Sequence, residues 1–159
     1  MFLLLGFAFP ACVDNTAPED AFGAGPNLAS FVNTSTNLSV VATGEEFVRD
    51  IPMEVKGPSL SNISSPVTAT ISVDPSSTAI EGVHFRLDQS TVEISPDNNL
   101  IGLLPVTVLT DNIDAPLDEA PVLVLNVSNV SGAENVIPNG RKISINLLYL
   151  CDSQLQGDY

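Results

Sequence analysis

The sequence predicts an all-β protein, an immunoglobulin-like antiparallel β-sandwich of about seven or eight strands. The composition is rich in Val, Ile, Leu, Ser, Thr, Asn and Pro, and β-branched residues mixed with turn formers favour strands. Turn signals recur roughly every eight to fifteen residues between short apolar runs. No segment shows the 3.6-residue periodicity of an amphipathic helix, and no internal repeat is evident.

The expected strands follow one another from residue 28 to residue 149. The clearest is 67–73, where apolar side chains at odd positions alternate with Thr and Ser, as in a half-buried strand. Residues 122–127 are apolar on both faces, which is typical of a central strand. Pro52 predicts an edge or irregular strand for 47–55, because proline has no N–H to donate. The other expected strands are 28–32, 38–41, 91–95, 101–110 and 143–149.

The N-terminus resembles an export signal of the lipoprotein type. An apolar run from Phe2 to Phe9 precedes Pro10, Ala11 and Cys12, and it is about half the length of a membrane span. Residues 1–12 are therefore interpreted as a signal segment and Cys12 as the lipid attachment site, which places the protein at the outer membrane or cell surface. A plain secretory signal with an incidental Cys12 is the alternative. No basic segment precedes Phe2, so the true start is expected upstream.

A tether is expected after the signal segment, and the second cysteine is expected to be unpaired. Residues 13–27 are rich in Pro, Gly, Asp and Glu, which predicts a flexible tether. With Cys12 lipidated, Cys151 has no obvious partner, so we expect a free thiol that is buried or half-buried. Two cysteines do not indicate a disulfide scaffold or a metal site.

The charge balance restricts the class of partner. Five basic residues against nineteen acidic ones leave a net charge of −14. Nucleic acid is excluded as a partner, because binding to phosphates needs a basic patch. Solvation of an extracellular surface explains the acidity most simply.

Three stretches between Leu38 and Leu150 resemble a known family. These are Thr78–Phe85 (TAIEGVHF), Thr91–Pro96 followed by Leu104–Val108, and the acidic loop from Asp111 running into Leu123–Asn129. In order and spacing they are similar to the Calx-beta domain, an immunoglobulin-like sandwich of sodium–calcium exchangers, integrins and bacterial surface proteins. Residues 28–150 are assigned to this module. The arrangement also resembles Gram-negative surface lipoproteins, in which 151–159 would begin a truncated following segment.

The resemblance implies a calcium site at one end of the sandwich, although several positions depart from the family pattern. His84 stands where the family has Asp, Asn112 replaces one member of an Asp pair, and Pro116 replaces the first of two Glu residues. Calcium prefers six to eight oxygen ligands, so only a weak site remains as an interpretation. Its ligands would be Asp111, Asp114, Asp118 and Glu119. The alternative is a solvated acidic loop.

The sequence predicts no enzymatic activity and no cofactor other than this weak calcium. The single histidine, His84, is interpreted as a turn residue, and no nucleophile elbow, phosphate loop or zinc pattern appears. We therefore expect a spacer, adhesion or interaction module that contacts an extracellular protein or glycan through end loops and sheet edges. Calcium binding is the alternative function. Glycan binding is a further alternative, weakened by the lack of Trp and the presence of only two Tyr. The end loops are 59–65, 80–84 and 111–119.

Overall fold

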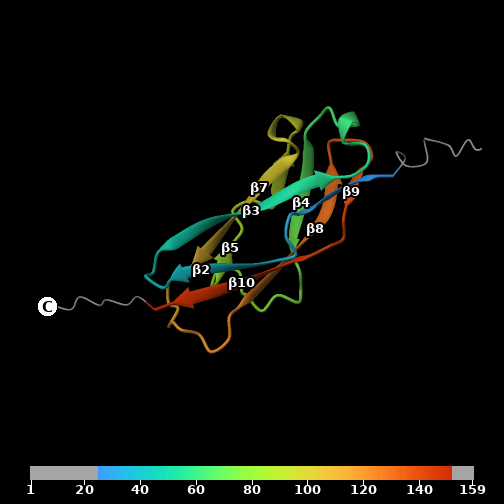
Figure 1. The fold of residues 1–159 in the computed structure, drawn as a ribbon. Coiled ribbons are helices and arrows are strands. Elements are labelled where there is room, and N and C mark those ends of the chain that lie inside the picture. Colours follow the sequence, from blue (N-terminus) through green and yellow to red (C-terminus); the bar gives the residue numbers. More distant parts are fainter. Residues whose placement is uncertain (1–24, 152–159) are drawn as a thin grey trace, which may run out of the picture.

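The computed structural model describes residues 25–151, which form two five-stranded sheets packed face to face (Figure 1). The first sheet has the order β5 (Phe85–Arg86), β7 (Ile101–Leu109), β3 (Glu46–Lys56), β1 (Asn27–Phe31) and β9 (Val136–Pro138). The second has the order β2 (Ser35–Val41), β10 (Ile143–Leu150), β8 (Val122–Ser131), β4 (Val67–Val73) and β6 (Thr91–Ile94). Two short 3₁₀ helices, η2 (Leu60–Asn62) and η3 (Pro96–Asn98), lie in connections. Within residues 25–151, no helix could span a membrane.

All eight expected strands are present, and the immunoglobulin-like sandwich is confirmed. The sequence pattern missed β5 and β9, which are two and three residues long. Such short segments cannot show a period of two, and only their partners define them. Phe85 of β5 pairs with Val108, and Val136 of β9 pairs with Asn27.

The sheets are antiparallel except at two places. β1 pairs with β9 in parallel, and β2 pairs with β10 in parallel. The chain crosses from the first sheet to the second between β1 and β2, and again between β9 and β10, so that β1 meets β9 in one sheet and β2 meets β10 in the other. The strictly antiparallel arrangement expected from the sequence is corrected in this respect.

Pro52 lies inside a sheet rather than on an edge strand, since β3 is flanked by β7 and β1. The carbonyl of Pro52 accepts a hydrogen bond from Val32 N–H at 3.0 Å. A strand residue points its N–H and C=O to the same side, so the missing N–H faces the point where β1 ends. The ladder with β7 therefore loses no hydrogen bond.

Asn27, expected in the tether, is the first residue of β1 and is 1% exposed. Its Oδ1 accepts a hydrogen bond from Ser59 N–H at 3.1 Å, and its Nδ2 donates to Ser59 O at 3.3 Å. A buried amide needs both partners. The sandwich therefore begins one residue earlier than the sequence predicts, and the rest of the tether up to residue 24 lies outside the described residues.

The core lies between the sheets and is built by the alternating positions of the long strands. In β3 the buried side chains are Ile51, Met53 and Val55, as the period of two predicts. β8 is the central strand of its sheet and also buries Val124 on the opposite face, which confirms the expectation of apolar residues on both sides. The largest fully buried side chain is Phe85.

Asp74, directly after β4, forms an ion pair that makes stability depend on pH. Its Oδ2 lies 2.7 Å from Lys142 Nζ, and its Oδ1 accepts hydrogen bonds from Ser76 Oγ at 2.6 Å and Ser76 N at 3.0 Å. Lys142, and next Ser76, lower the pKa of Asp74 from 3.8 to about 2. Because the folded pKa is depressed, this stabilisation is complete above the unfolded value and is lost as pH falls through about 2.

We expect Asp74→Asn to lower the melting temperature at pH 6 and to leave it nearly unchanged at pH 2. Thermal unfolding of wild type and variant at pH steps between these limits measures the effect. The two curves should converge as pH falls from about 4 to about 2, because the unfolded chain takes up a proton near pH 3.8 and the folded protein only at about pH 2. Parallel curves would show that the ion pair does not contribute.

Candidate functional site

The connections gather at the two ends of the sandwich. The segments 42–45, 79–84 and 110–121 lie at the end where β10 finishes, and 57–66 and 132–135 lie at the end where β1 begins. Of the three expected binding loops, 80–84 and 111–119 therefore share one end. The loop 59–65 lies at the other, beside Gly132 and Glu134.

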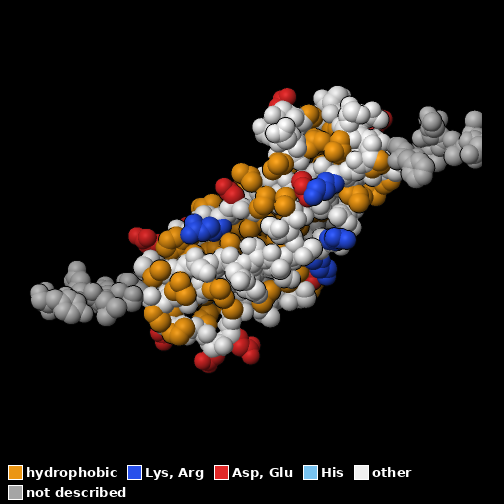
Figure 2. Space-filling view, viewed as in Figure 1, with side chains coloured by type: hydrophobic (Ala, Val, Ile, Leu, Met, Phe, Trp, Pro, Cys, Tyr) orange, Lys and Arg blue, Asp and Glu red, His pale blue; other side chains and the backbone are white. Residues whose placement is uncertain are grey.

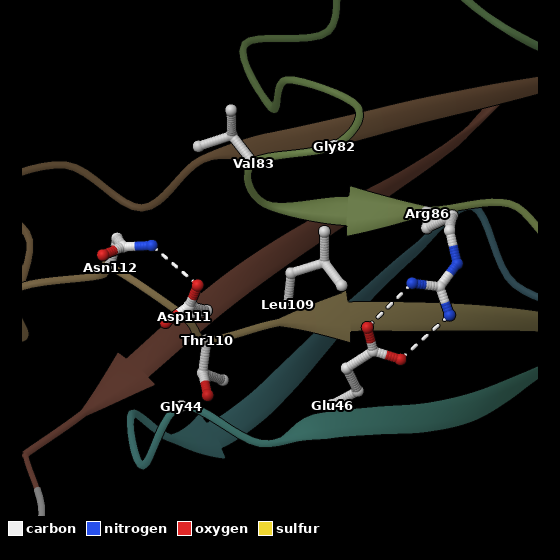
Figure 3. Close-up of a pocket in the computed structure, with 9 residues that line it drawn as sticks. All are labelled: Gly44, Glu46, Gly82, Val83, Arg86, Leu109, Thr110, Asp111 and Asn112. Atoms are coloured by element: carbon white, nitrogen blue, oxygen red, sulfur yellow. Dashed lines mark hydrogen bonds and ion pairs between the residues drawn. The ribbon is translucent and has the colours of Figure 1, made fainter.

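A cleft of about 580 Å³ opens between these shared-end loops and the ends of β3, β5 and β7 (Figure 3). Its volume is within the usual range for small-ligand sites. It combines apolar, amide, hydroxyl and charged groups. The lining residues are Gly44, Glu46, Gly82, Val83, Arg86, Leu109, Thr110, Asp111 and Asn112.

Arg86 and Glu46 form one wall of the cleft. The two guanidinium nitrogens Nη1 and Nη2 of Arg86 donate to Glu46 Oε1 at 2.8 Å and Oε2 at 2.9 Å, which is a bidentate pair (Figure 3). Arg86 Nε donates to Asp88 Oδ1 at 2.6 Å, and Asp88 Oδ2 accepts from Thr107 Oγ1 at 2.9 Å. The network joins β3, β5 and β7 through side chains.

The same network sets the charge of this wall. Hydrogen bonds from Arg86 lower the pKa of Glu46 and of Asp88, and the hydrogen bonds to Glu46 and Asp88 raise the pKa of Arg86. All three groups are therefore ionised at neutral pH. The charge of Glu46 is balanced by Arg86, so a ligand in the cleft would meet a neutralised carboxylate.

The opposite side of the cleft carries Asp111 and Asn112, just after β7. Asn112 adopts a left-handed conformation with φ of 58°, and its Nδ2 donates to Asp111 Oδ2 at 2.7 Å. Thr110 is buried, and its Oγ1 donates to Glu45 O at 2.7 Å, which ties this loop to the start of β3. The Asp111 carboxylate is consequently held at the rim.

The turn 80–84 is organised by His84. The backbone N–H of Ile80 donates to His84 Nδ1 at 2.9 Å, and His84 N donates back to Ile80 O at 2.8 Å. Tyr149 Oη donates to His84 O at 3.0 Å. Burial lowers the pKa of His84, and an Nδ1 that accepts a hydrogen bond carries no proton. His84 therefore acts as a neutral turn residue in this arrangement.

The four candidate calcium ligands all lie in the loop between β7 and β8 and are exposed. They alternate with Ile113, Ala115 and Leu117, which pack against the core. Asp111 is the member that lines the cleft. Within residues 25–151, the structure brings together no group of three or more His, Cys, Asp or Glu side chains that could hold a metal ion.

Of the two cysteine predictions, the structure tests only the one for Cys151. Cys151 is a free thiol, as expected, but it is exposed rather than buried, because it follows the last residue of β10. Its Sγ lies 3.3 Å from Ala115 O. Cys12 and the rest of the expected signal segment lie outside the described residues, as do residues 152–159.

Arg86 was not predicted from the sequence as a residue of the cleft. One signal was available, because Arg86 is one of only five basic residues in the chain and lies two positions from Asp88. Its partner Glu46 is forty positions away. Only the pairing of β7 with both β3 and β5 brings the two together.

No protein-family model and no curated protein matches the chain. Among solved structures, the chain is similar to a candidate carbohydrate-binding protein from Bacteroides ovatus, with a TM-score of 0.53 and 16% sequence identity. The similarity covers 77% of this chain and 37% of that protein, so the chain spans little more than a third of its length. At this identity the likeness shows a shared fold alone.

Two further solved structures have lower scores. A PapD-like domain of human CEP192 has a TM-score of 0.48 and 10% identity, over 79% of this chain and 87% of that one. A two-domain protein of unknown function from Bacteroides fragilis has a TM-score of 0.45 and 8% identity, over 79% and 46% of the two chains.

Proposed function

We propose that this chain is an exported, lipid-anchored, non-enzymatic β-sandwich that acts as a stiff spacer and presents an interaction surface at its far end. The observation that supports the proposal is the position of the chain ends. The described chain enters at one end of an elongated sandwich and leaves at the other (Figure 1). A module connected in this way adds its whole length to the distance between its neighbours.

Both ends are attached to the body of the sandwich. Asn135 Nδ2 donates to Gly25 O at 3.3 Å, and Cys151 lies beside the loop that contains Ala115. The longest strand, β3, has eleven residues and therefore spans about 36 Å at roughly 3.3 Å per residue. A two-sheet body with fixed ends resists bending more than a flexible linker of equal length.

A distance measurement tests the spacer function. Spin labels on Cys151 and on a Gly25→Cys variant, in a full chain that also carries Cys12→Ser, report the separation of the two ends. Gly25 accepts a side chain, because an added Cβ would lie 3.6 Å from its nearest neighbour, Pro58. We expect one narrow distribution near 35–45 Å. A mean below about 25 Å, or a broad distribution, would contradict a stiff spacer.

The proposed anchor is tested separately, in a Gram-negative host that expresses the full chain. The wild type should fractionate with membranes, because several acyl chains on one cysteine give stable attachment. Cys12→Ser should move the protein to the soluble fraction. Equal membrane fractions for both proteins would overturn lipidation at Cys12 without affecting the spacer measurement.

The proposed interaction surface is the cleft at the far end, and its ligand class would be an extracellular protein or a glycan. The mixture of Arg86, Thr110, Asp111 and Asn112 supplies both donors and acceptors of hydrogen bonds. The similarity in fold to a candidate carbohydrate-binding protein fits the glycan alternative. The resemblance to Calx-beta domains implies a binding site that includes Asp111, and Asp111 lines this cleft.

Calcium binding is the second candidate function, and the observation that favours it is the Asp111 carboxylate at the rim of the cleft. If calcium binds there, millimolar calcium should raise the melting temperature by several degrees, because a ligand that binds the folded state stabilises it. Asp111→Ala and Glu119→Ala should remove the rise. Glu134→Ala, at the opposite end, is the control and should retain it. An unchanged melting temperature in wild type would contradict calcium binding, and the spacer and interaction function would remain as the only proposal.

A further inference from the structure

Both sheets end on the same side in the half of the sandwich near Gly44. β2 is the last strand of its sheet. β3 pairs with β1 only from Met53 onward, so its first half has β7 as its single partner. The short connection 42–45 joins the two strands. We call this side, formed by Ser35–Val41 of β2 and Glu46–Ile51 of β3, the open seam. Figure 2 shows hydrophobic side chains exposed along it.

The outer edge of β2 offers unpaired backbone groups. Ser144 N donates to Thr34 O at 3.0 Å, and Ala42 N donates to Leu150 O at 2.9 Å, so even-numbered residues direct their backbone groups toward β10. Alternation then directs the N–H and C=O groups of Ser35, Asn37 and Ser39 away from the sheet. β2 contains no proline and no charged residue, which are the usual protections of an edge strand.

Arg49 occupies a core-facing position that the opposite sheet does not cover. It pairs directly with Val106, which is fully buried, so both side chains leave the same face of the sheet. Arg49 is nevertheless exposed, because β2 is the last strand on this side. Its guanidinium lies 5.8 Å from the ring centre of Phe47, and its Nη1 donates to Val48 O at 3.2 Å.

The charge of Arg49 has no acidic partner among residues 25–151. Arg86 is held by two carboxylates, whereas Arg49 contacts a ring face and one carbonyl. Guanidinium groups bind carboxylates through paired, charge-assisted hydrogen bonds. An extended chain laid along β2 would therefore meet backbone hydrogen-bonding groups at the edge, the half-buried Phe47 and a cation without an acidic partner.

We propose that the open seam binds an extended, acidic segment of a partner protein, which adds to β2 as a further strand. The backbone of the segment would pair with Ser35, Asn37 and Ser39, an apolar side chain would cover Phe47, and an Asp or Glu side chain would pair with Arg49. A second copy of this chain fits less well, because it would bring a net charge of −14 and a second Arg49 to the same seam. The seam meets the cleft at Glu46, which belongs to both, but the residues proposed to bind the segment do not line the cleft. The proposal is independent of the spacer function.

Selection from a displayed library of random eight-residue peptides, on the full chain carrying Cys12→Ser, tests the proposal. We expect enriched sequences to alternate apolar residues and to contain Asp or Glu. A synthetic peptide of the most enriched sequence is then titrated against variants. Ser39→Pro removes an outward N–H without breaking the ladder to β10, and should weaken binding at least about tenfold. Ser39→Ala, which keeps the N–H, should bind within about twofold of wild type.

A charge exchange gives a second, independent readout. Arg49→Glu should weaken binding of the acidic peptide at least about tenfold and should restore it for a peptide whose carboxylate is replaced by Lys. Because Arg49 is exposed, this variant remains informative if Ser39→Pro fails to fold. The proposal is overturned if the library yields no enriched sequence or if the enriched peptides are basic. It is also overturned if neither Ser39→Pro nor Arg49→Glu changes the affinity for the peptide.

Discussion

Phe85→Ala should destabilise the domain by about 3–5 kcal/mol, the usual cost of removing a fully buried phenylalanine. Phe85 is 0% exposed and has the largest fully buried side chain. It belongs to a strand of two residues, so β5 is held mainly by this side chain and by the ion pairs of Arg86. Its carbonyl also accepts a hydrogen bond from Gly82 N–H at 2.8 Å, at the rim of the cleft. The loss of packing should therefore loosen the turn 80–84 as well.

Equilibrium unfolding in urea measures this effect, with Ile80→Ala as the matched control. Ile80 is in the neighbouring turn but is 57% exposed, and its truncation should change the free energy of unfolding by less than about 0.5 kcal/mol. The unfolding midpoint of Phe85→Ala should shift while the slope remains similar. A cost below about 1 kcal/mol for Phe85→Ala would mean that β5 is not part of the cooperative core.

Gly132→Ala is expected to cost about 2–4 kcal/mol, from backbone strain and overpacking together. Gly132 follows β8 with φ of +96°, a region that side chains with a Cβ rarely adopt. An added Cβ would also lie 2.5 Å from the backbone oxygen of Pro66. Because that neighbour is backbone, it cannot rotate away.

Gly140→Ala separates the two contributions to that cost. Gly140 has φ of +74°, and an added Cβ would meet nothing within 4 Å. Its substitution should cost only the strain, about 1–2 kcal/mol. The difference between the two variants in the free energy of unfolding then reports the clash with Pro66. Equal costs would indicate that the loop before β4 moves to accept the methyl group.

The alternating pattern predicted strands well wherever one face is buried. For 67–73 the predicted bounds and those of β4 are identical. Successive side chains of a strand point to opposite faces, so one set packs in the core and the other faces water, and the sequence alternates accordingly. β5 and β9 were not predicted, since neither is long enough to alternate. The edge strand predicted from Pro52 was wrong for a different reason. β3 lies inside the sheet, and the missing N–H of Pro52 faces the point where β1 ends. Whether a missing N–H matters depends on which neighbouring strand has already ended.

The candidate site was predicted less completely than the fold. The sequence predicted three end loops, because sandwiches place their connections at the two ends, but it did not indicate which loops share an end. The structure brings 80–84 and 111–119 together. The loop 59–65 lies at the other end. Arg86 and Glu46 were missed because their contact depends on strand register, with Phe85 opposite Val108 and Glu46 opposite Leu109.

The sequence by itself determined the class of fold, the long strands and the acidic charge of the chain. These follow from local periodicity, turn chemistry and charge, which need no knowledge of distant residues. Only the tertiary structure decided which strands are neighbours, where the chain leaves the sandwich and which charges remain unpaired. Arg49 illustrates the reason. The alternation along β3 places it toward the core, and it stays in solvent because the opposite sheet ends at β2.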